Sequence, residues 1–260
     1  MVGLLESGRT FAFLVLIVEI ILIWYLARKA RLGKLPYIRQ IPALDAIVEG
    51  VGRATELGKP VYIIPGRGSL SSGASADTLA ANSLMSYVAE VAAKVGTKVI
   101  TTAAFPELLP LFEDTIRTGY AAAGRPELFD PGDIRYAPST FPWVQAVLGT
   151  IGREKPGLCV IIGSFGHEVV NIGEAGHIHG AMNIGGTASM SNLAFMVATC
   201  DYSFISEEMY VAGAYVTKDP DQLGSIEAED YLKAVLLAIF VIGIIAITFG
   251  SSAVIDLLKM

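Results

Sequence analysis

Two long apolar segments, one near each end of the chain, constrain this protein more than any other feature of its sequence. The first, Thr10 to Ala27, reads TFAFLVLIVEIILIWYLA and contains a single charged residue, Glu19. The second, Ala234 to Ile255, reads AVLLAIFVIGIIAITFGSSAVI and contains none. At a rise of about 1.5 Å per residue, helices of about 18 and 22 residues are close to the bilayer's hydrocarbon thickness of about 30 Å. We therefore expect two transmembrane helices.

The first apolar segment is expected to stay in the protein as an anchor. A cleaved secretory signal ends in a small-x-small site, whereas this segment ends in Trp24, Tyr25 and a basic cluster. The cluster comprises Arg28, Lys29, Arg31, Lys34 and Arg39, while the other flank carries only Arg9 and the amino terminus. Because basic residues remain on the cytoplasmic side, we predict a cell-membrane protein with a cytoplasmic central domain and external termini. The lipid bilayer is then a partner, and its anionic headgroups meet the basic cluster.

The expected organisation follows from these segments. It consists of an external N-terminus (1–9), a span (10–27), a basic juxtamembrane segment (28–42), an α/β domain (43–218), an acidic linker (219–233), a span (234–255) and an external C-terminus (256–260). Between Gln40 and Asp230 there are 11 Lys or Arg and 22 Asp or Glu, so the domain lacks the basic surface of a nucleic-acid binder. Cys159 and Cys200 fit buried thiols in a reducing compartment better than a disulfide.

Short β-rich runs alternate with helical patterns in the middle of the chain. The predicted strands are residues 61–64, 98–102, 134–137, 158–162 and 202–205. Residues at helical spacing lie between them, namely Ala80, Leu84, Tyr87, Val88 and Val91, then Leu108, Phe112, Ile116 and Tyr120. Pro106 and Pro142 stand near expected helix starts, and Gly96, Gly124 and Gly152 past expected helix ends. The alternation predicts an α/β fold, a mainly parallel sheet with helices on both faces (Rossmann-like), flanked by the two spans.

Ligands of open α/β sheets lie beyond the carboxyl ends of the strands, which directs attention to the loops there. The loop after the first strand, PGRGSLSSGAS, offers flexible backbone amides and a cation, and we expect a helix to begin near Ser75 or Asp77. The candidate residues for a small anionic ligand are Gly66, Arg67, Gly68, Ser69, Gly73, Ser75, Ser164 and Glu207. Ala74 replaces the P-loop lysine and Ser71 the third dinucleotide-binding glycine, which disfavours classic ATP hydrolysis and NAD chemistry. A purely structural glycine-rich turn is the alternative.

All three histidines fall in one segment, GSFGHEVVNIGEAGHIHG. His167, His177, His179 and Glu174 are candidate metal ligands, since imidazole and carboxylate suit transition metals. His177 and His179 would share a face if their stretch were extended. The spacing matches no known metal motif, so ordinary polar residues are the alternative.

Two further candidates for catalysis are weak. Ser164 follows a strand, but Ile162 stands where a nucleophile elbow requires glycine. Glu207 and Glu208 are explained by a helix start that Ser206 caps. The sequence specifies neither a catalytic residue nor a cofactor.

Glu19 is a carboxyl group within a membrane span, where a charge is costly and a functional role is the default expectation. The second span offers it only Thr248, Ser251 and Ser252 as polar side chains. Glu19 is therefore expected to be protonated, or to meet a copy of itself or another protein. Two spans are too few for a transport pathway within one subunit, so assembly is favoured over transport.

Several long motifs resemble an uncharacterised family of bacterial and archaeal membrane proteins, a domain of unknown function. They are VYIIPGRG, AAAGRPELFDPGDIRY, REKPGLCVIIGSFGHE, GTASMSNLAFMVATCDYSFISEEMYVAGAYVTKDPDQLGS and the terminal span. The resemblance extends from about Ala43 to the second span and implies a membrane-anchored α/β domain without assigning an activity. The favoured function is a homo-oligomeric scaffold or ligand-sensing module. The alternative is a membrane-attached enzyme acting on a small anionic or nucleotide-like substrate at the strand ends.

Overall fold

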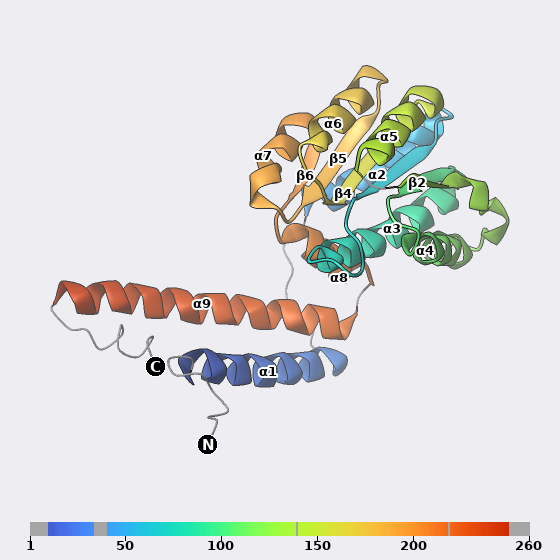
Figure 1. Ribbon diagram of the computed structural model, residues 1–260. Helices are drawn as coiled ribbons and strands as arrows, with labels where there is room; N and C mark the ends of the chain where they lie inside the picture. Colours follow the sequence, from blue (N-terminus) through green and yellow to red (C-terminus); the bar gives the residue numbers. More distant parts are fainter. Residues whose placement is uncertain (1–9, 34–40, 139, 218, 250–260) are drawn as a thin grey trace. The chain divides into compact units, whose positions relative to one another are not determined.

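The computed structural model describes residues 10–33, 41–138, 140–217 and 219–249. The chain divides into two compact units, an α/β domain within Arg39–Thr217 and a pair of helices from the two ends of the chain (Figure 1). The predicted fold class is confirmed in both parts. The first unit contains a parallel sheet, and the second consists of two long apolar helices packed together.

A six-stranded parallel sheet forms the centre of the α/β domain. Its strands are β1 (Val61–Gly66), β2 (Val99–Ala103), β3 (Ile134–Tyr136), β4 (Leu158–Ser164), β5 (Met182–Thr187) and β6 (Tyr202–Ile205), in the spatial order β3-β2-β1-β4-β5-β6. Val61 pairs with Val99 on one side and Leu158 on the other, so β1 lies at the centre. Every residue of β1 is buried, as expected for a strand covered on both faces.

Helices cover both faces of the sheet. They are α2 (Pro42–Glu56), α3 (Ser75–Val95), α4 (Leu108–Ala122), α5 (Thr140–Glu154), α6 (Glu168–Ile178), α7 (Met190–Thr199) and α8 (Glu208–Thr217). The expected helix start near Ser75 and the apolar spacings of α3 and α4 are confirmed. Gly96 ends α3 in the left-handed region at φ 78°, as its position past a helix end predicted.

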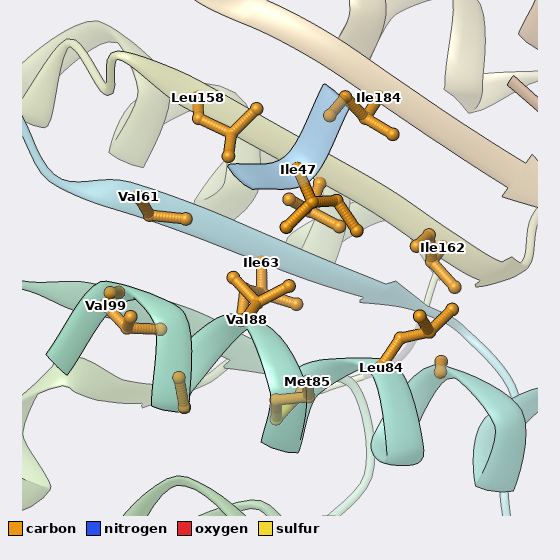
Figure 2. Close-up of a cluster of buried hydrophobic side chains, with 14 of the residues drawn as sticks. Ile47, Val61, Ile63, Leu84, Met85, Val88, Val99, Leu158, Ile162 and Ile184 are labelled. Carbon is orange, nitrogen blue, oxygen red and sulfur yellow. The ribbon is translucent and has the colours of Figure 1, made fainter. Parts of the chain in front are cut away.

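Successive strand residues point to opposite faces and build two cores. On one face Val61, Ile63 and Val160 pack with α2, α3, α4 and α8. Figure 2 shows the centre of this core, where Ile47 of α2 and Leu84, Met85 and Val88 of α3 surround the strand side chains. On the other face Tyr62, Cys159 and Ile161 pack with α5, α6 and α7. The alternation with a period of two therefore holds both helical layers onto one sheet.

β5 (Met182–Thr187), which contains Gly185 and Gly186, was not predicted from the sequence. The glycines serve packing instead. A Cβ atom on Gly185 would lie 2.4 Å from Met196 Sδ and 2.5 Å from Cys200 Sγ, so only glycine lets α7 approach the strand. Asn183 is buried because its amide donates to the carbonyls of Gly173 (2.7 Å) and Thr199 (3.2 Å).

Two further expectations about helices were wrong. Gly152 lies inside α5, which ends at Glu154, and Lys155 rather than a glycine takes the left-handed conformation at φ 47°. The stretch with His177 and His179 is helical and not extended, because it forms the last turn and cap of α6. On a helix, residues two apart point about 200° from one another, so these two histidines do not share a face.

The second unit is an antiparallel pair formed by α1 (Thr10–Arg31) and α9 (Pro220–Thr248). Arg31 bonds to Asp221 in a bidentate pair (2.7 and 2.6 Å), and Lys29 bonds to Glu227 (2.7 Å). Gly224 permits close packing, since a Cβ there would lie 2.5 Å from the Ala27 backbone. The acidic stretch is thus the first part of α9, continuous with the apolar stretch that follows it.

Both helices are long and apolar enough to cross a membrane, and only 6% of each apolar window is buried within the structure. Side chains such as Ile20, Leu237 and Phe240 are more than half exposed. Charged side chains gather at one end, where Arg28 also lies over the Trp24 ring at 5.8 Å. The expected ends of the chain, the basic residues Lys34 and Arg39, and Ser251 and Ser252 lie outside the described residues.

Candidate functional site

The sheet order creates one topological switch point, between β1 and β4. From β1 the chain proceeds through α3 to β2 and β3, then crosses back to β4 and continues to β5 and β6. Loops that follow β1 and β4 therefore leave in opposite directions, and ligands of open parallel sheets bind between such loops. Here these loops are residues 67–74 and 165–167.

Two glycines bring the carboxyl ends of β1 and β4 close together. Gly66 has φ 75°, and a Cβ on it would lie 2.4 Å from the Ser164 carbonyl oxygen. Gly163 has φ 131°, and a Cβ on it would lie 2.4 Å from the Pro65 carbonyl oxygen. The Arg67 N–H donates to the Ser164 carbonyl at 2.8 Å. The structure thus brings together the predicted residues Gly66, Arg67 and Ser164, with the Ser164 backbone as the connecting group.

An ion pair spans the switch point. Arg67 Nε donates to Glu168 Oε1 at 2.5 Å, and the Gly166 N–H donates to the same oxygen at 2.8 Å. The two side chains are 27% and 13% exposed, so solvent screens the pair only partly. Burial raises the pKa of the Glu168 carboxyl, but hydrogen bonds from Arg67 and from the Gly166 and Glu168 backbone outweigh it and hold this pKa below its ordinary value. A carboxylate thus occupies the start of α6 beside the only cation of the loop after β1.

The serine-rich part of the loop is held by its own side chains. Ser72 Oγ donates to the Ser69 carbonyl at 3.2 Å and accepts from the Ala74 N–H at 3.2 Å. Gly68 lies against the first turn of α3, where a Cβ would be 2.2 Å from Thr78 Oγ1. Gly73 is exposed, with open space around its α-carbon, and Ser75 begins the helix. The loop is therefore an ordered turn that directs Arg67 toward β4, and only Gly68 within it is required for packing.

Residues that follow β5 also lie at the carboxyl ends of the strands. The sequence did not predict them as site residues because β5 itself was not predicted. Asn192, 7% exposed, donates through Nδ2 to the Phe165 carbonyl (2.8 Å) and to Ser189 Oγ (3.1 Å). Its Oδ1 has no hydrogen-bond partner among the described residues. The sequence signal was the polar run Ser189, Ser191 and Asn192 directly after Gly-Gly-Thr-Ala.

Glu207 is exposed and follows β6, which β4 and β5 separate from β1. The adjoining helix α8 nevertheless returns to α3, because Tyr210 donates a hydrogen bond to Asp77 in its first turn. Glu207 thus lies at the carboxyl ends of the strands, but next to β6 and away from the switch point between β1 and β4. Glu208, its neighbour, accepts from the Ile205 N–H at 3.0 Å and so joins the end of β6 to the start of α8.

The histidines are spread along α6. His167 is its N-cap, exposed and 5.6 Å from the Phe195 ring, whereas His177 lies in the last turn and His179 is the C-cap. Ten residues of helix separate His167 from His177 by about 15 Å. Across residues 10–33, 41–138, 140–217 and 219–249, no group of three or more His, Cys, Asp or Glu could hold a metal ion.

A cavity of about 270 Å³ lies at the amino ends of the strands. It is lined by residues that precede β2 and β3, including Thr97, Lys98, Asp130 and Asp133. Lys98 Nζ lies 2.6 Å from Asp133 Oδ1. Burial raises the pKa of the Asp133 carboxyl, and Lys98 opposes this shift. The cavity lies at the amino ends of the strands, away from the position where parallel sheets bind ligands.

The strand order and the switch-point loops define a Rossmann-like α/β domain, carried by a chain that also contains two long apolar helices. The chain belongs to the family described as a domain of unknown function, DUF6754, whose model matches residues 2–258. No characterised protein and no solved structure matches the chain significantly. Family membership agrees with the resemblance seen in the motifs and extends it to nearly the whole chain.

The Arg67–Glu168 ion pair predicts a pH dependence of stability. The pKa of Glu168 is lower in the folded state than in the unfolded one, so the pair stabilises above the ordinary carboxyl pKa of about 4.3, and this contribution is lost as pH falls through the folded pKa. Glu168→Gln should lower the free energy of unfolding near pH 7 by about 1.5 to 3 kcal/mol, with a smaller difference near pH 3. Denaturant unfolding at both pH values measures this. The exposed Glu174→Gln on the same helix is the control, and an equal loss in both variants would contradict the prediction.

Proposed function

We propose that this protein is a membrane-anchored cytoplasmic module whose copies associate with one another, and that its α/β domain senses a small anionic ligand. The observation that carries the first part is Glu19, a half-buried carboxyl group in an apolar helix that has no hydrogen bond or ion pair with another described residue. In hydrocarbon such a group is neutralised by protonation, by an interhelical hydrogen bond or by an ion, and the described part of this helix pair supplies no hydrogen-bond partner for it.

The position of Glu19 on α1 supports this reasoning. The less exposed residues of the helix recur every three or four positions, at Val15, Glu19, Leu22, Leu26 and Ala30, and mark the side toward α9. Ala27 packs against Gly224, so the antiparallel register places Glu19 at the level of Leu232. The adjacent cation of α9, Lys233, is bonded to Glu229 at 3.0 Å. Glu19 is only half-buried on that side, so its carboxyl can still be reached by the helix pair of another copy.

The hydrophobic effect does not drive helices together within a membrane, because lipid tails are as apolar as the helices. Association through Glu19 therefore depends on hydrogen bonds and packing. A protonated carboxyl both donates and accepts a hydrogen bond, so two copies can exchange a pair of bonds. Each such bond contributes about 0.6 to 2 kcal/mol in a membrane. The large exposed apolar surface of α1 and α9 supplies the packing contacts around it.

We expect Glu19→Leu to weaken the assembly and Glu19→Gln to preserve it, since glutamine also donates and accepts. Light scattering in mild detergent, with the detergent mass subtracted, measures the protein mass as a function of concentration. Val18→Leu, at the neighbouring and more exposed position, is the matched control and should behave as the unaltered protein. A monomeric mass for the unaltered protein at micromolar concentration would contradict self-association.

The cytoplasmic placement rests on the three basic residues in the last turn of α1, at the charged end of the hairpin. In intact cells, an impermeant thiol reagent should label a cysteine introduced at Ser7 and should leave Asp221→Cys unlabelled until the cells are opened. Ser7 lies outside the described residues. The native thiols give little background, because burial raises the pKa of Cys159 well above its ordinary range and that of Cys200 to about 12. The reverse labelling pattern would place the domain outside.

A small anionic ligand at the switch point is the second part of the proposal, and the Arg67–Glu168 pair supports it. The Glu168 carboxylate bonds to Arg67 and to the Gly166 N–H, the kinds of donor that bind a phosphate at a helix start. The Glu168 carboxylate thus occupies the position that the anionic ligand takes in this proposal, and the ligand must displace it to bind. Catalysis on a small anionic or nucleotide-like substrate is the alternative use of the same site.

Inorganic pyrophosphate is a suitable probe of this site, and calorimetry on the full chain measures its binding. Glu168→Gln removes the competing charge and should tighten binding about tenfold, whereas Arg67→Gln should abolish it; charge-assisted bonds of this kind contribute about 1.5 to 3 kcal/mol. Glu174→Gln, on the same helix, should leave the affinity unchanged. Absence of binding to Glu168→Gln at millimolar pyrophosphate would refute the anion site.

A further inference from the structure

A second group of polar side chains adjoins the Arg67–Glu168 ion pair. The strand order places β5 beside β4, so the loops after β1, β4 and β5 follow one another along the carboxyl ends of the strands. Gly166, in the loop after β4, donates to Glu168, and its neighbour Phe165 accepts from Asn192 in the first turn of α7. Two successive residues of one loop therefore connect the ion pair to the start of α7.

The side-chain amide of Asn192 has a fixed orientation. The Phe165 carbonyl can only accept a hydrogen bond, so the atom that faces it at 2.8 Å is Nδ2, which also donates to Ser189 Oγ at 3.1 Å. Oδ1 belongs to the same planar group and therefore lies between the loop after β4 and the start of α7. Asn192 is 7% exposed, and its Oδ1 has no hydrogen-bond partner among the described residues. Because buried acceptors are nearly always paired, Oδ1 requires a donor from outside the described chain.

The start of α7 offers further polar groups. Ser189 is the N-cap residue, but its hydroxyl does not cap the helix, because it accepts from Asn192 Nδ2 and lies 3.0 Å from Ser191 Oγ. The first backbone N–H groups of α7 are therefore left by this side chain to donate to a ligand. Ser191 is exposed, and its hydroxyl can both donate and accept. Asn192 Oδ1, the two serine hydroxyls and the first N–H groups of α7 are here called the α7 polar cluster.

The composition of the α7 polar cluster distinguishes between the chemical groups of a ligand. An ionised phosphate or carboxylate accepts from the N–H groups but cannot donate to Asn192 Oδ1. An ammonium group donates to Oδ1 but cannot accept from the N–H groups. A hydroxyl does both. Arg67 is the only cation of the loop after β1, so the charged part of the ligand is expected beside it and the hydroxylated part at α7.

We infer that the anionic ligand of the switch point is a phosphate ester of a small polyol or sugar, and that the α7 polar cluster binds its hydroxyl groups. The phosphate takes the place of the Glu168 carboxylate beside Arg67 and the Gly166 N–H. A hydroxyl of the same molecule passes the two serine side chains and donates to Asn192 Oδ1, while it accepts from the first turn of α7. The inference rests on the anion site proposed above and specifies the rest of its ligand.

The test compares two phosphate esters by calorimetry on the full-length protein in mild detergent. Glycerol 3-phosphate and propyl phosphate share a phosphate group and a three-carbon chain, but only the first carries hydroxyls. Glu168→Gln is the background, because it removes the competing carboxylate. Glycerol 3-phosphate should bind about tenfold more tightly, since propyl phosphate leaves the buried acceptor of Asn192 unpaired.

A substitution at Asn192 assigns this preference to its side chain. In the same background, Asn192→Ala should reduce the ratio of the two affinities to about twofold or less. The loss of the bond to Phe165 affects both esters alike, so their ratio isolates the contact with the hydroxyl. Asn171→Ala, at an exposed position of α6, is the matched control and should leave the ratio unchanged.

The outcomes separate this inference from the proposed anion site. Equal affinities for the two esters would overturn the inference, with water as the donor to Oδ1, and would leave the anion site intact. A preference for glycerol 3-phosphate that survives Asn192→Ala would also overturn it, because another part of the protein would then bind the hydroxyls. If neither ester nor pyrophosphate binds to Glu168→Gln, both proposals are refuted. Competition by phosphatidylglycerol in nanodiscs would support a lipid headgroup as the source of the polyol phosphate, and lack of competition a soluble ester.

Discussion

The pairing of β1 with β4 is the contact on which the rest of the α/β domain depends. These strands occupy the centre of the sheet, and their side chains alternate between two cores that would otherwise be separate. The chain leaves β1 on one side and returns at β4 from the other, so this pairing closes the longest excursion within the sheet. The same pairing brings Gly66 against Ser164, and the position of Arg67 beside Glu168 follows from it.

The helical pair obeys a different physical rule. Within the α/β domain apolar side chains are buried by one another, whereas most apolar side chains of α1 and α9 remain exposed, as in helices long and apolar enough to span a membrane. The two helices are joined instead by polar contacts, since most of their charged side chains gather at one end and form ion pairs there. Glu19 is the exception, and its isolation gives the pair a chemical feature that packing alone would not produce.

The sequence predicted most of the fold because most of it obeys simple periodicities. The runs Val61–Ile64 and Leu158–Ile162 are too short for helices and too apolar for exposed strands, so burial on both faces was the remaining interpretation. β5 was not predicted for a physical reason. Gly185 and Gly186 make room for the close approach of Met196 and Phe204, and these contacts between distant residues leave no local sequence pattern. The loop residues Gly66 to Ser75 were recognised from composition. Their connection to Glu168 was not, because it joins residues about a hundred positions apart.

The ion pairs between the two apolar helices also have a consequence for biosynthesis. Lys29 and Glu227 are 198 residues apart, and Arg31 and Asp221 are 190 apart, so neither pair exists until the start of α9 has left the ribosome. At about 5 to 20 residues per second, α1 waits roughly 10 to 40 seconds for its partner. During that interval α1, with Glu19, is without α9 while the α/β domain emerges and begins to fold. The helix pair is therefore begun before the α/β domain and completed only after it.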